Sequence, residues 1–247
     1  YNNIEISRKI LNKNKKKINS IIIEPIQASL PLNNSKNYLK FLENFCAKNN
    51  TTLIFDEMIT AIRSDKNSVQ KNYNIKPGIT TIGKIIGGGM PIGIIGISKK
   101  VYQMIKNKKI FYGGTFSGNS LSSFVGNETL KHLNKNKHIV RNVNIKSKYF
   151  QDNLNEFIRV HKMNLKIYRY SSIIRIVYTN NKIDNRTQRD FFENKISTRI
   201  NKFKKFLFQK KIHYPSNGII FFSDATSYKS INYVIKCIKT GLKKYFL

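Results

Sequence analysis

An aspartate and a lysine, each placed directly after an apolar run, are the residues of this sequence best suited to chemistry. Asp56 follows Thr52–Phe55, and Lys84 lies between Ile79–Ile82 and the glycine run Gly87–Gly89. Short runs rich in β-branched and aromatic residues predict buried strands. Ligands of an open α/β sheet bind at the carboxyl ends of its strands, where we expect both side chains to lie. The glycines allow a sharp turn or a close approach of backbone to a ligand.

The two side chains have complementary chemistry. A lysine that desolvation keeps partly neutral can form a Schiff base, and an aspartate can hold a proton on a pyridine nitrogen. Pyridoxal 5'-phosphate requires both groups from the protein that binds it. On residue type alone, the alternatives are that Lys84 is a surface lysine and that Asp56 is a turn residue or a helix cap.

The composition limits the classes of function. The chain has 247 residues, enough for one or two domains, and a net charge of +32. The lysines are spread through predicted helices and loops beside many Asn and Ile residues, which share A/T-rich codons with lysine. The densest cluster, Lys13–Lys17, is interpreted as a solvated face. We therefore expect salt-sensitive contact with polyanions but no specific nucleic-acid site.

Other signals are weak. Cys46 and Cys237 are isolated, and the four histidines have no ligand spacing, so we expect neither a disulfide framework nor a metal site. No apolar run reaches the length of a membrane span, and no signal peptide is visible. We expect a cytoplasmic protein that has no contact with membranes.

Strands and helices alternate in the first half of the chain. Ile21–Ile23 is expected as a strand that ends at Glu24 and Pro25, and residues 35–48 as an amphipathic helix. Residues 92–97 are a further strand, whereas residues 64–76 are polar and are expected to form an exposed loop. Alternation of this kind favours an α/β fold with a mainly parallel sheet.

The second half predicts a smaller α+β domain. Helical patterns cover roughly 119–133, 139–161 and 188–210, and strands are expected at 173–178 and 219–222. In the last helix one face is apolar, a core stripe formed by Ile231, Val234, Ile235, Ile238 and Leu242. We place the domain boundary within the helical region, which gives a large domain at 1–135 and a small domain at 136–247.

Four stretches carry a resemblance to a known family. They are IIIEPIQ at Ile21–Gln27, LIFDEMITAIR at Leu53–Arg63, TTIGKIIGGGMPIG at Thr80–Gly93 and GGTFSGNSLS at Gly113–Ser122. In this order they resemble the class III aminotransferases, which are fold-type I pyridoxal-phosphate enzymes, and within them the glutamate-1-semialdehyde 2,1-aminomutase subgroup. The likeness continues more faintly to the C-terminus. It implies the fold-type I architecture, with part of the large domain followed by the small domain.

Family members have a long N-terminal portion that carries a Ser-Gly-Thr phosphate-binding loop and an aromatic residue that stacks on the cofactor. The start of this sequence resembles a point midway through the large domain. The resemblance thus implies a fragment of a gene product, or a separately encoded half. We expect this polypeptide alone to bind the cofactor weakly or to aggregate.

The resemblance assigns roles around the cofactor. Lys84 is the Schiff-base lysine, and Asp56 pairs with the pyridinium nitrogen. Gln27, in the EPxQ motif, contacts the ring hydroxyl. Met58 packs on the ring face or, as the alternative, belongs to the core. Glu57 supports the loop through hydrogen bonds.

The same resemblance implies an assembly and a substrate contact. Thr115, with Gly114 beside it, reaches the phosphate of the neighbouring subunit's cofactor, which implies a homodimer with shared sites. Glycine-exposed N–H groups beside a hydroxyl make a reasonable phosphate cradle, and an ordinary tight turn is the alternative. Arg63 is a candidate for binding a substrate carboxylate. Ala61 departs from the glycine that is usual in the family at this position.

The function expected from these residues is pyridoxal-phosphate-dependent amino-group transfer on a small amino-bearing carbonyl compound. An aminomutase would move the amino group within glutamate 1-semialdehyde, whereas an aminotransferase uses a separate donor and acceptor. Gln27, which the aminomutases usually lack, and the short Lys106–Lys109 connection favour the aminotransferase version. The alternative from another class is a non-catalytic homologue that binds a partner or a polyanion.

Overall fold

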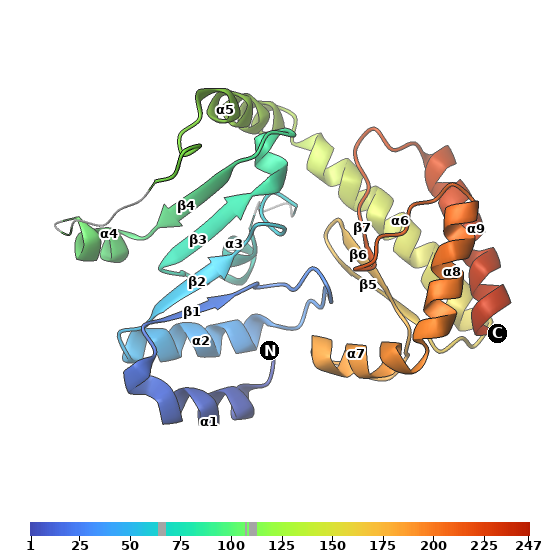
Figure 1. Cartoon of the computed structure of the whole chain (residues 1–247), viewed down its shortest axis with the longest axis horizontal. Helices are drawn as coiled ribbons and strands as arrows, with labels where there is room; N and C mark the ends of the chain where they lie inside the picture. Colours follow the sequence, from blue (N-terminus) through green and yellow to red (C-terminus); the bar gives the residue numbers. More distant parts are fainter. Residues whose placement is uncertain (64–67, 107, 109–112) are drawn as a thin grey trace. The chain divides into compact units, whose positions relative to one another are not determined.

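The computed structural model describes residues 1–63, 68–106, 108 and 113–247, which form two compact units (Figure 1). The N-terminal unit comprises Asn3–Pro25 and Asn34–Val140. The C-terminal unit comprises Tyr1–Asn2, Ile26–Asn33 and Arg141–Leu247. The chain thus leaves the first unit after Pro25, contributes eight residues to the second, and returns. The division falls inside a helix at residues 140 and 141, a few residues beyond the expected boundary.

The N-terminal unit contains helices around a mainly parallel sheet. Its elements are α1 (Ile4–Asn14), η1 (Lys15–Lys17), β1 (Ser20–Ile23), α2 (Lys36–Lys48), β2 (Thr52–Asp56), α3 (Val69–Tyr73), β3 (Ile79–Gly83), η2 (Lys84–Gly87), β4 (Gly93–Ile97), α4 (Lys99–Ile105) and α5 (Ser120–Lys135).

Within the described residues the strand order is β1-β2-β3-β4, with β1, β2 and β3 parallel and β4 antiparallel to β3. The expectation of a mainly parallel sheet is confirmed. Helix α2 connects β1 to β2 as in other parallel crossovers, and its apolar face packs against β2. The buried side chains at this contact include Leu39, Leu42, Leu53 and Phe55.

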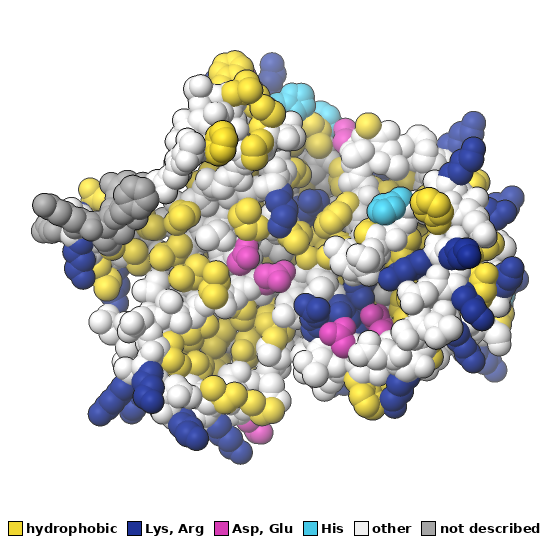
Figure 2. Space-filling view, viewed as in Figure 1, with side chains coloured by type: hydrophobic (Ala, Val, Ile, Leu, Met, Phe, Trp, Pro, Cys, Tyr) yellow, Lys and Arg dark blue, Asp and Glu magenta, His cyan; other side chains and the backbone are white. Residues whose placement is uncertain are grey.

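The edge strand β4 is the least covered strand of this sheet. All five of its residues are exposed, among them Ile94, Ile95 and Ile97, and Ile22 on the opposite edge is exposed as well. Figure 2 shows hydrophobic side chains gathered over the strands of this unit. Exposed apolar surface of this extent marks contact with another polypeptide or ligand.

One expectation for this unit is wrong. Residues 64–76 were expected to be an exposed loop, yet Val69–Tyr73 form helix α3, with Val69 fully buried; residues 64–67 lie outside the described residues. The Ser68 hydroxyl caps the helix by accepting a hydrogen bond from Lys71 N at 3.3 Å. The segment has too few apolar residues for a periodic pattern, so its helix depends on contacts made elsewhere in the fold.

The C-terminal unit packs helices on an antiparallel sheet of order β5-β6-β7. Its elements are α6 (His138–Val160), β5 (Lys166–Tyr170), β6 (Ile173–Val177), α7 (Arg186–Lys195), α8 (Ser197–Gln209), β7 (Ile219–Ile220) and α9 (Tyr228–Phe246). The helical pattern expected over 188–210 is in fact two helices, which are interrupted at Ile196.

The apolar stripe of α9 forms part of the core of this unit. Ile231, Ile235, Ile238 and Leu242 are buried, whereas Val234 is only partly buried at the edge. They pack with residues of α6, β6 and α8, including the fully buried Phe150 and Phe203. The amphipathic pattern of the last helix therefore predicted its buried face correctly.

No helix in the described part of the chain is both long and apolar enough to cross a bilayer. Cys46 and Cys237 are buried free thiols, and burial raises the pKa of the Cys46 thiol to about 11. A thiol with such a raised pKa is a weak nucleophile at neutral pH. Among the described residues, no group of three or more His, Cys, Asp or Glu side chains is placed to hold a metal ion.

Candidate active site

The carboxyl ends of β2 and β3 hold Asp56 in a defined position. Asp56 ends β2, and the parallel register places it beside Thr81 of β3. Its Oδ1 accepts hydrogen bonds from Met58 N at 3.0 Å and from Thr81 Oγ1 at 3.3 Å. Its Oδ2 accepts none from the residues that the structure describes, and the side chain is half-buried. One oxygen is therefore fixed by the fold, while the other is open to a ligand.

Lys84 directly follows β3 and begins the short helix η2. It lies three residues beyond Thr81, the residue that pairs with Asp56. The residue is exposed, and within the described ranges its Nζ has no hydrogen-bond or ion-pair partner. Adjacent strands thus bring a carboxylate and an unpaired amine to the same edge of the sheet.

The backbone of Lys84 is strained. Its φ is +54°, in the left-handed region that non-glycine residues avoid. Such a conformation costs on the order of 1–3 kcal/mol, and residues that hold it gather at functional sites. Gly88 and Gly89 follow with φ of +58° and +99°, so the run after Lys84 needs glycine at these positions.

The glycines also permit close packing of this turn. A Cβ on Gly88 would lie 2.3 Å from Thr129 Oγ1 of α5, and one on Gly126 of α5 would lie 3.3 Å from Ile86 O. Helix α5 and η2 therefore approach each other almost backbone to backbone. This contact holds the segment after Lys84 against the body of the N-terminal unit.

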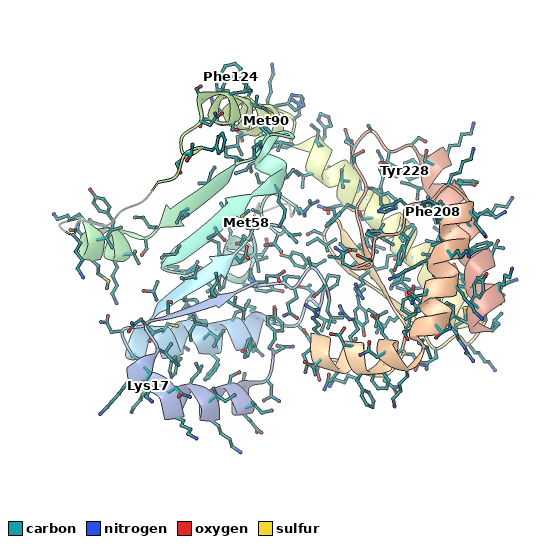
Figure 3. The ribbon with its side chains drawn as sticks, viewed as in Figure 1. Lys17, Met58, Met90, Phe124, Phe208 and Tyr228 are labelled. Carbon is teal, nitrogen blue, oxygen red and sulfur yellow. The ribbon has the colours of Figure 1, made fainter. Side chains whose placement is uncertain are left out.

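Met58 lies beside the backbone that carries Lys84. A Cβ on Gly83 would be 2.4 Å from Met58 Cε and 3.0 Å from Met58 Sδ, so the thioether rests on Gly83. Figure 3 shows Met58 over the β2 and β3 strands. The side chain is half-buried and leaves part of its surface available to a flat ligand.

Glu57 supports the turn after β2, as its position next to Asp56 led us to expect. Its fully buried carboxylate accepts hydrogen bonds from Val69 N at 2.8 Å, Gln70 N at 3.1 Å and Thr60 Oγ1 at 3.0 Å. Burial raises the pKa of Glu57, and these three hydrogen bonds oppose the shift. The carboxylate thereby connects the end of β2 to the first turn of α3.

Thr115 and Gly114 line a different part of the same unit. With β4 and α5 they border an open groove of about 1070 Å³, whose lining includes neither Asp56 nor Lys84. Both residues are exposed, and Phe116 next to them is 83% exposed. The structure therefore separates the predicted phosphate contact from the Asp56–Lys84 edge within one copy of the chain.

Gln27 and Arg63 have different surroundings. Gln27 belongs to the C-terminal unit, and its Oε1 is buried without a hydrogen-bond partner among the described residues. Arg63 Nε donates to Ile59 O at 2.7 Å, and burial lowers the pKa of its guanidinium. In the same turn Ile62 has a φ of +64°, next to the alanine that departs from the family's glycine. Here the strain is at Ile62 and not at Ala61.

The strain at Lys84 predicts an unusual effect on stability. Lys84→Gly should raise the free energy of unfolding by about 1 kcal/mol relative to Lys84→Ala, because glycine adopts a positive φ without a Cβ penalty. Lys99 in the first turn of α4 is the control, since Lys99→Gly should instead be less stable than Lys99→Ala. Urea denaturation of the four variants measures both differences. Equal stability of the two Lys84 variants would contradict a strained backbone.

The burial of Glu57 predicts a pH effect. Because its folded-state pKa is raised above 4.5, the stability it contributes is complete below that pH and is lost as the pH rises through the folded-state pKa. The free energy of unfolding of the wild type should therefore fall with rising pH relative to that of Glu57→Gln. Glu128→Gln, which alters a surface ion pair with Lys131, is the matched control. The raised pKa of Glu57 would be refuted if the difference in the free energy of unfolding between wild type and Glu57→Gln stayed constant as the pH rises from below 4.5.

Comparisons with known proteins identify the family of this chain. The sequence model of the family described as "Aminotransferase class-III" matches residues 2–195. A glutamate-1-semialdehyde 2,1-aminomutase 2 from Lachnoclostridium phytofermentans is 29% identical over 98% of this chain and 57% of its own length. A glutamate-1-semialdehyde 2,1-aminomutase from Methanococcus vannielii is 38% identical over 74% of this chain and 42% of its own length.

Solved structures share the fold at low sequence identity. A β-phenylalanine aminotransferase from Variovorax paradoxus has a TM-score of 0.87 at 19% identity, covering 99% of this chain and 56% of its own. A glutamate-1-semialdehyde aminomutase from Pseudomonas aeruginosa has a TM-score of 0.85 at 13% identity, covering all of this chain and 56% of its own. The chain spans about half the length of the relatives it matches. On the family match over most of its residues, it belongs to the class III aminotransferases.

Proposed function

We propose that this chain contributes the cofactor-binding edge of a pyridoxal-phosphate-dependent enzyme that transfers amino groups. The observation that carries the proposal is that Asp56 and Lys84 lie at the ends of adjacent strands, and that within the described residues one Asp56 oxygen and the Lys84 amine have no partner. The family match and a solved structural neighbour described as a transaminase with PLP bound support the cofactor. Because the chain spans only part of its relatives, the activity is proposed for the whole protein.

The side chains of this chain fit the chemical groups of pyridoxal phosphate. Asp56 Oδ2 is free to accept a hydrogen bond from a protonated ring nitrogen, and Lys84 Nζ is free to bind the aldehyde carbon covalently. The orphaned Oε1 of Gln27 is an acceptor suited to the ring hydroxyl. Met58 offers an apolar surface to a ring face. When bound, the cofactor supplies an electron sink for a carbanion at the substrate carbon.

The residues of this chain would then act in sequence. Asp56 keeps the ring nitrogen protonated, because a carboxylate beside it favours the charged form. Lys84, when its amine is free, would carry a proton between carbon atoms as a general base and acid. Arg63 is proposed to bind a substrate carboxylate, for which a guanidinium is suited.

We propose glutamate 1-semialdehyde as the substrate, as the names of the sequence relatives suggest, with the amino group moved within one molecule. The second candidate is an aminotransferase with a separate amino donor and acceptor. Gln27 favours it, because the aminomutases usually lack this glutamine, and several structural neighbours are described as transaminases. A non-catalytic binding module is not favoured, because the family match covers most of the chain and the chain has both Asp56 and Lys84.

We further propose that the whole protein is a cytoplasmic homodimer. Thr115 and Gly114 would contact the phosphate of the cofactor held by the second copy. Their groove is bordered by β4 and α5. Dimerisation at this groove would bury exposed apolar side chains on or near it, namely Phe116, Leu121 and Phe124. Figure 3 shows Phe124 on the outer side of α5. Two-fold association is the commonest assembly of soluble homo-oligomers.

Covalent labelling tests the role of Lys84. After incubation with pyridoxal 5'-phosphate and reduction with borohydride, peptide mapping should find the label on the peptide that contains Lys84. Lys84→Ala should lose most of this label, whereas Lys99→Ala, with the exposed lysine of α4 removed, should retain it. A label on another lysine, or one spread evenly over the many lysines, would exclude Lys84 as the cofactor lysine.

A further inference from the structure

The segment that carries Gln27 is built into the C-terminal unit. Of Ile26–Asn33, Ile26, Ala28 and Leu30 are each at most 2% exposed. Leu30 and Leu32 pack against Val177 of β6 and Ile183. These apolar contacts bury the segment, but contacts of this kind are non-directional and do not by themselves fix the position of a backbone.

The backbone of this segment forms a turn with Gln27 at its start. Leu30 N donates to Gln27 O at 3.0 Å, and Leu32 N donates to Leu30 O at 2.8 Å. The Ser29 carbonyl belongs to this turn and points to helix α7. A contact that holds the Ser29 carbonyl therefore also restrains the backbone of Gln27, two residues earlier in the same turn.

Arg189 of α7 holds the Ser29 carbonyl. Its side chain is 5% exposed, and its Nη1 donates to Ser29 O. The guanidinium also donates from Nε and Nη2 to the carboxylate of Asp190, and its Nε lies 3.5 Å from Glu193 Oε2. Glu193 in turn accepts from Arg175 of β6 at 2.8 Å.

These ion pairs hold the guanidinium of Arg189 in one orientation, in addition to its hydrogen bond with the turn. Two carboxylates of α7 orient it, and Glu193 connects it to the sheet through Arg175, whose side chain is 7% exposed. An arginine in such a setting presents a rigid planar fork of donors, which a lysine cannot reproduce. The hydrogen bond from this guanidinium to the part-buried Ser29 carbonyl is charge-assisted, and such bonds are roughly twice as strong as neutral ones.

We propose that Arg189 is a positioning residue for Gln27: by holding the Ser29 carbonyl, it fixes the turn that carries the Gln27 side chain. The inference rests on the function proposed above for Gln27. Arg189 itself does not touch the cofactor, and it acts only through the 27–30 turn.

Arg186 on the same helix provides a matched comparison. Its Nε pairs with Asp190 Oδ2 at 3.3 Å, but its side chain is 62% exposed, and Asp190 belongs to the same helix. Removing Arg186 thus removes one positive charge beside the same carboxylate without touching the turn. The pair of variants separates anchoring from a general change of charge.

Amide hydrogen exchange on the purified whole protein, without added cofactor, tests the anchor. In Arg189→Met the amides of Leu30 and Leu32 should exchange about 10-fold faster, because the part-buried Ser29 carbonyl has lost its partner. Ile238 in the core of α9 should keep its protection, and Arg186→Met should behave as the wild type. Arg189→Lys, which retains the charge, should restore part of the protection and serves if the methionine variant does not fold. Unchanged exchange at Leu30 and Leu32 would overturn the proposal.

A double-mutant cycle tests the connection to Gln27, with pyridoxal 5'-phosphate affinity measured by absorbance titration. Arg189→Met and Gln27→Ala should each weaken binding, whereas the double variant should bind no more weakly than Gln27→Ala. Additive losses would overturn the proposal. Wild-type affinity in Gln27→Ala would instead contradict the role proposed for Gln27, and the exchange result would then decide alone whether Arg189 holds the turn.

Discussion

The parallel pairing of β2 with β3 is the constraint on which the candidate site depends. It places Asp56 beside Thr81, whose hydroxyl binds one carboxylate oxygen and leaves the other open. It also brings Lys84, at the end of β3, to the same edge of the sheet. A register shift of one residue would turn the strand's side chains to the opposite face and separate the acid from the amine.

Neighbouring elements stabilise two residues at this edge whose conformation or burial is unfavourable. Lys84 has a strained backbone, and Glu57 is a buried carboxylate, each of which is unfavourable by itself. The α5–η2 contact around Gly88 supports the first, and hydrogen bonds from Val69 N and Gln70 N support the second. Local conflicts of this kind, held in place by neighbouring elements, are expected at functional sites.

Much of the fold was predictable from the sequence, because the relevant signals are local. The apolar runs before Asp56 and Lys84 identified two adjacent strands, and the stripe on α9 identified a core face. Helix α3 could not be found this way, since part of its support is the Glu57 carboxylate, twelve residues before Val69. Registers and long-range contacts leave no pattern in a single sequence.

The candidate site was predictable only in part, for the same reason. Asp56 and Lys84 have a signal of their own, in the strand ends and the glycine run. Thr81 gains its role only through the register with β2. Arg189 is one basic residue in a chain with 45 lysines and arginines, and its contact with Ser29 spans 160 residues. The resemblance indicated Gln27 but not the residue that holds its turn.

Asp56 and Lys84 are proposed to serve one pyridine cofactor, with Asp56 acting on its ring nitrogen. This role is tested by comparing the binding of pyridoxal 5'-phosphate with that of an analogue in which carbon replaces the ring nitrogen, for the wild type and Asp56→Asn. We expect Asp56→Asn to weaken binding of pyridoxal 5'-phosphate by about 10-fold or more, the loss expected for a charge-assisted hydrogen bond. Binding of the analogue should be unchanged. An equal loss for both ligands would contradict the proposed role, because Asp56 would then act on something other than the ring nitrogen.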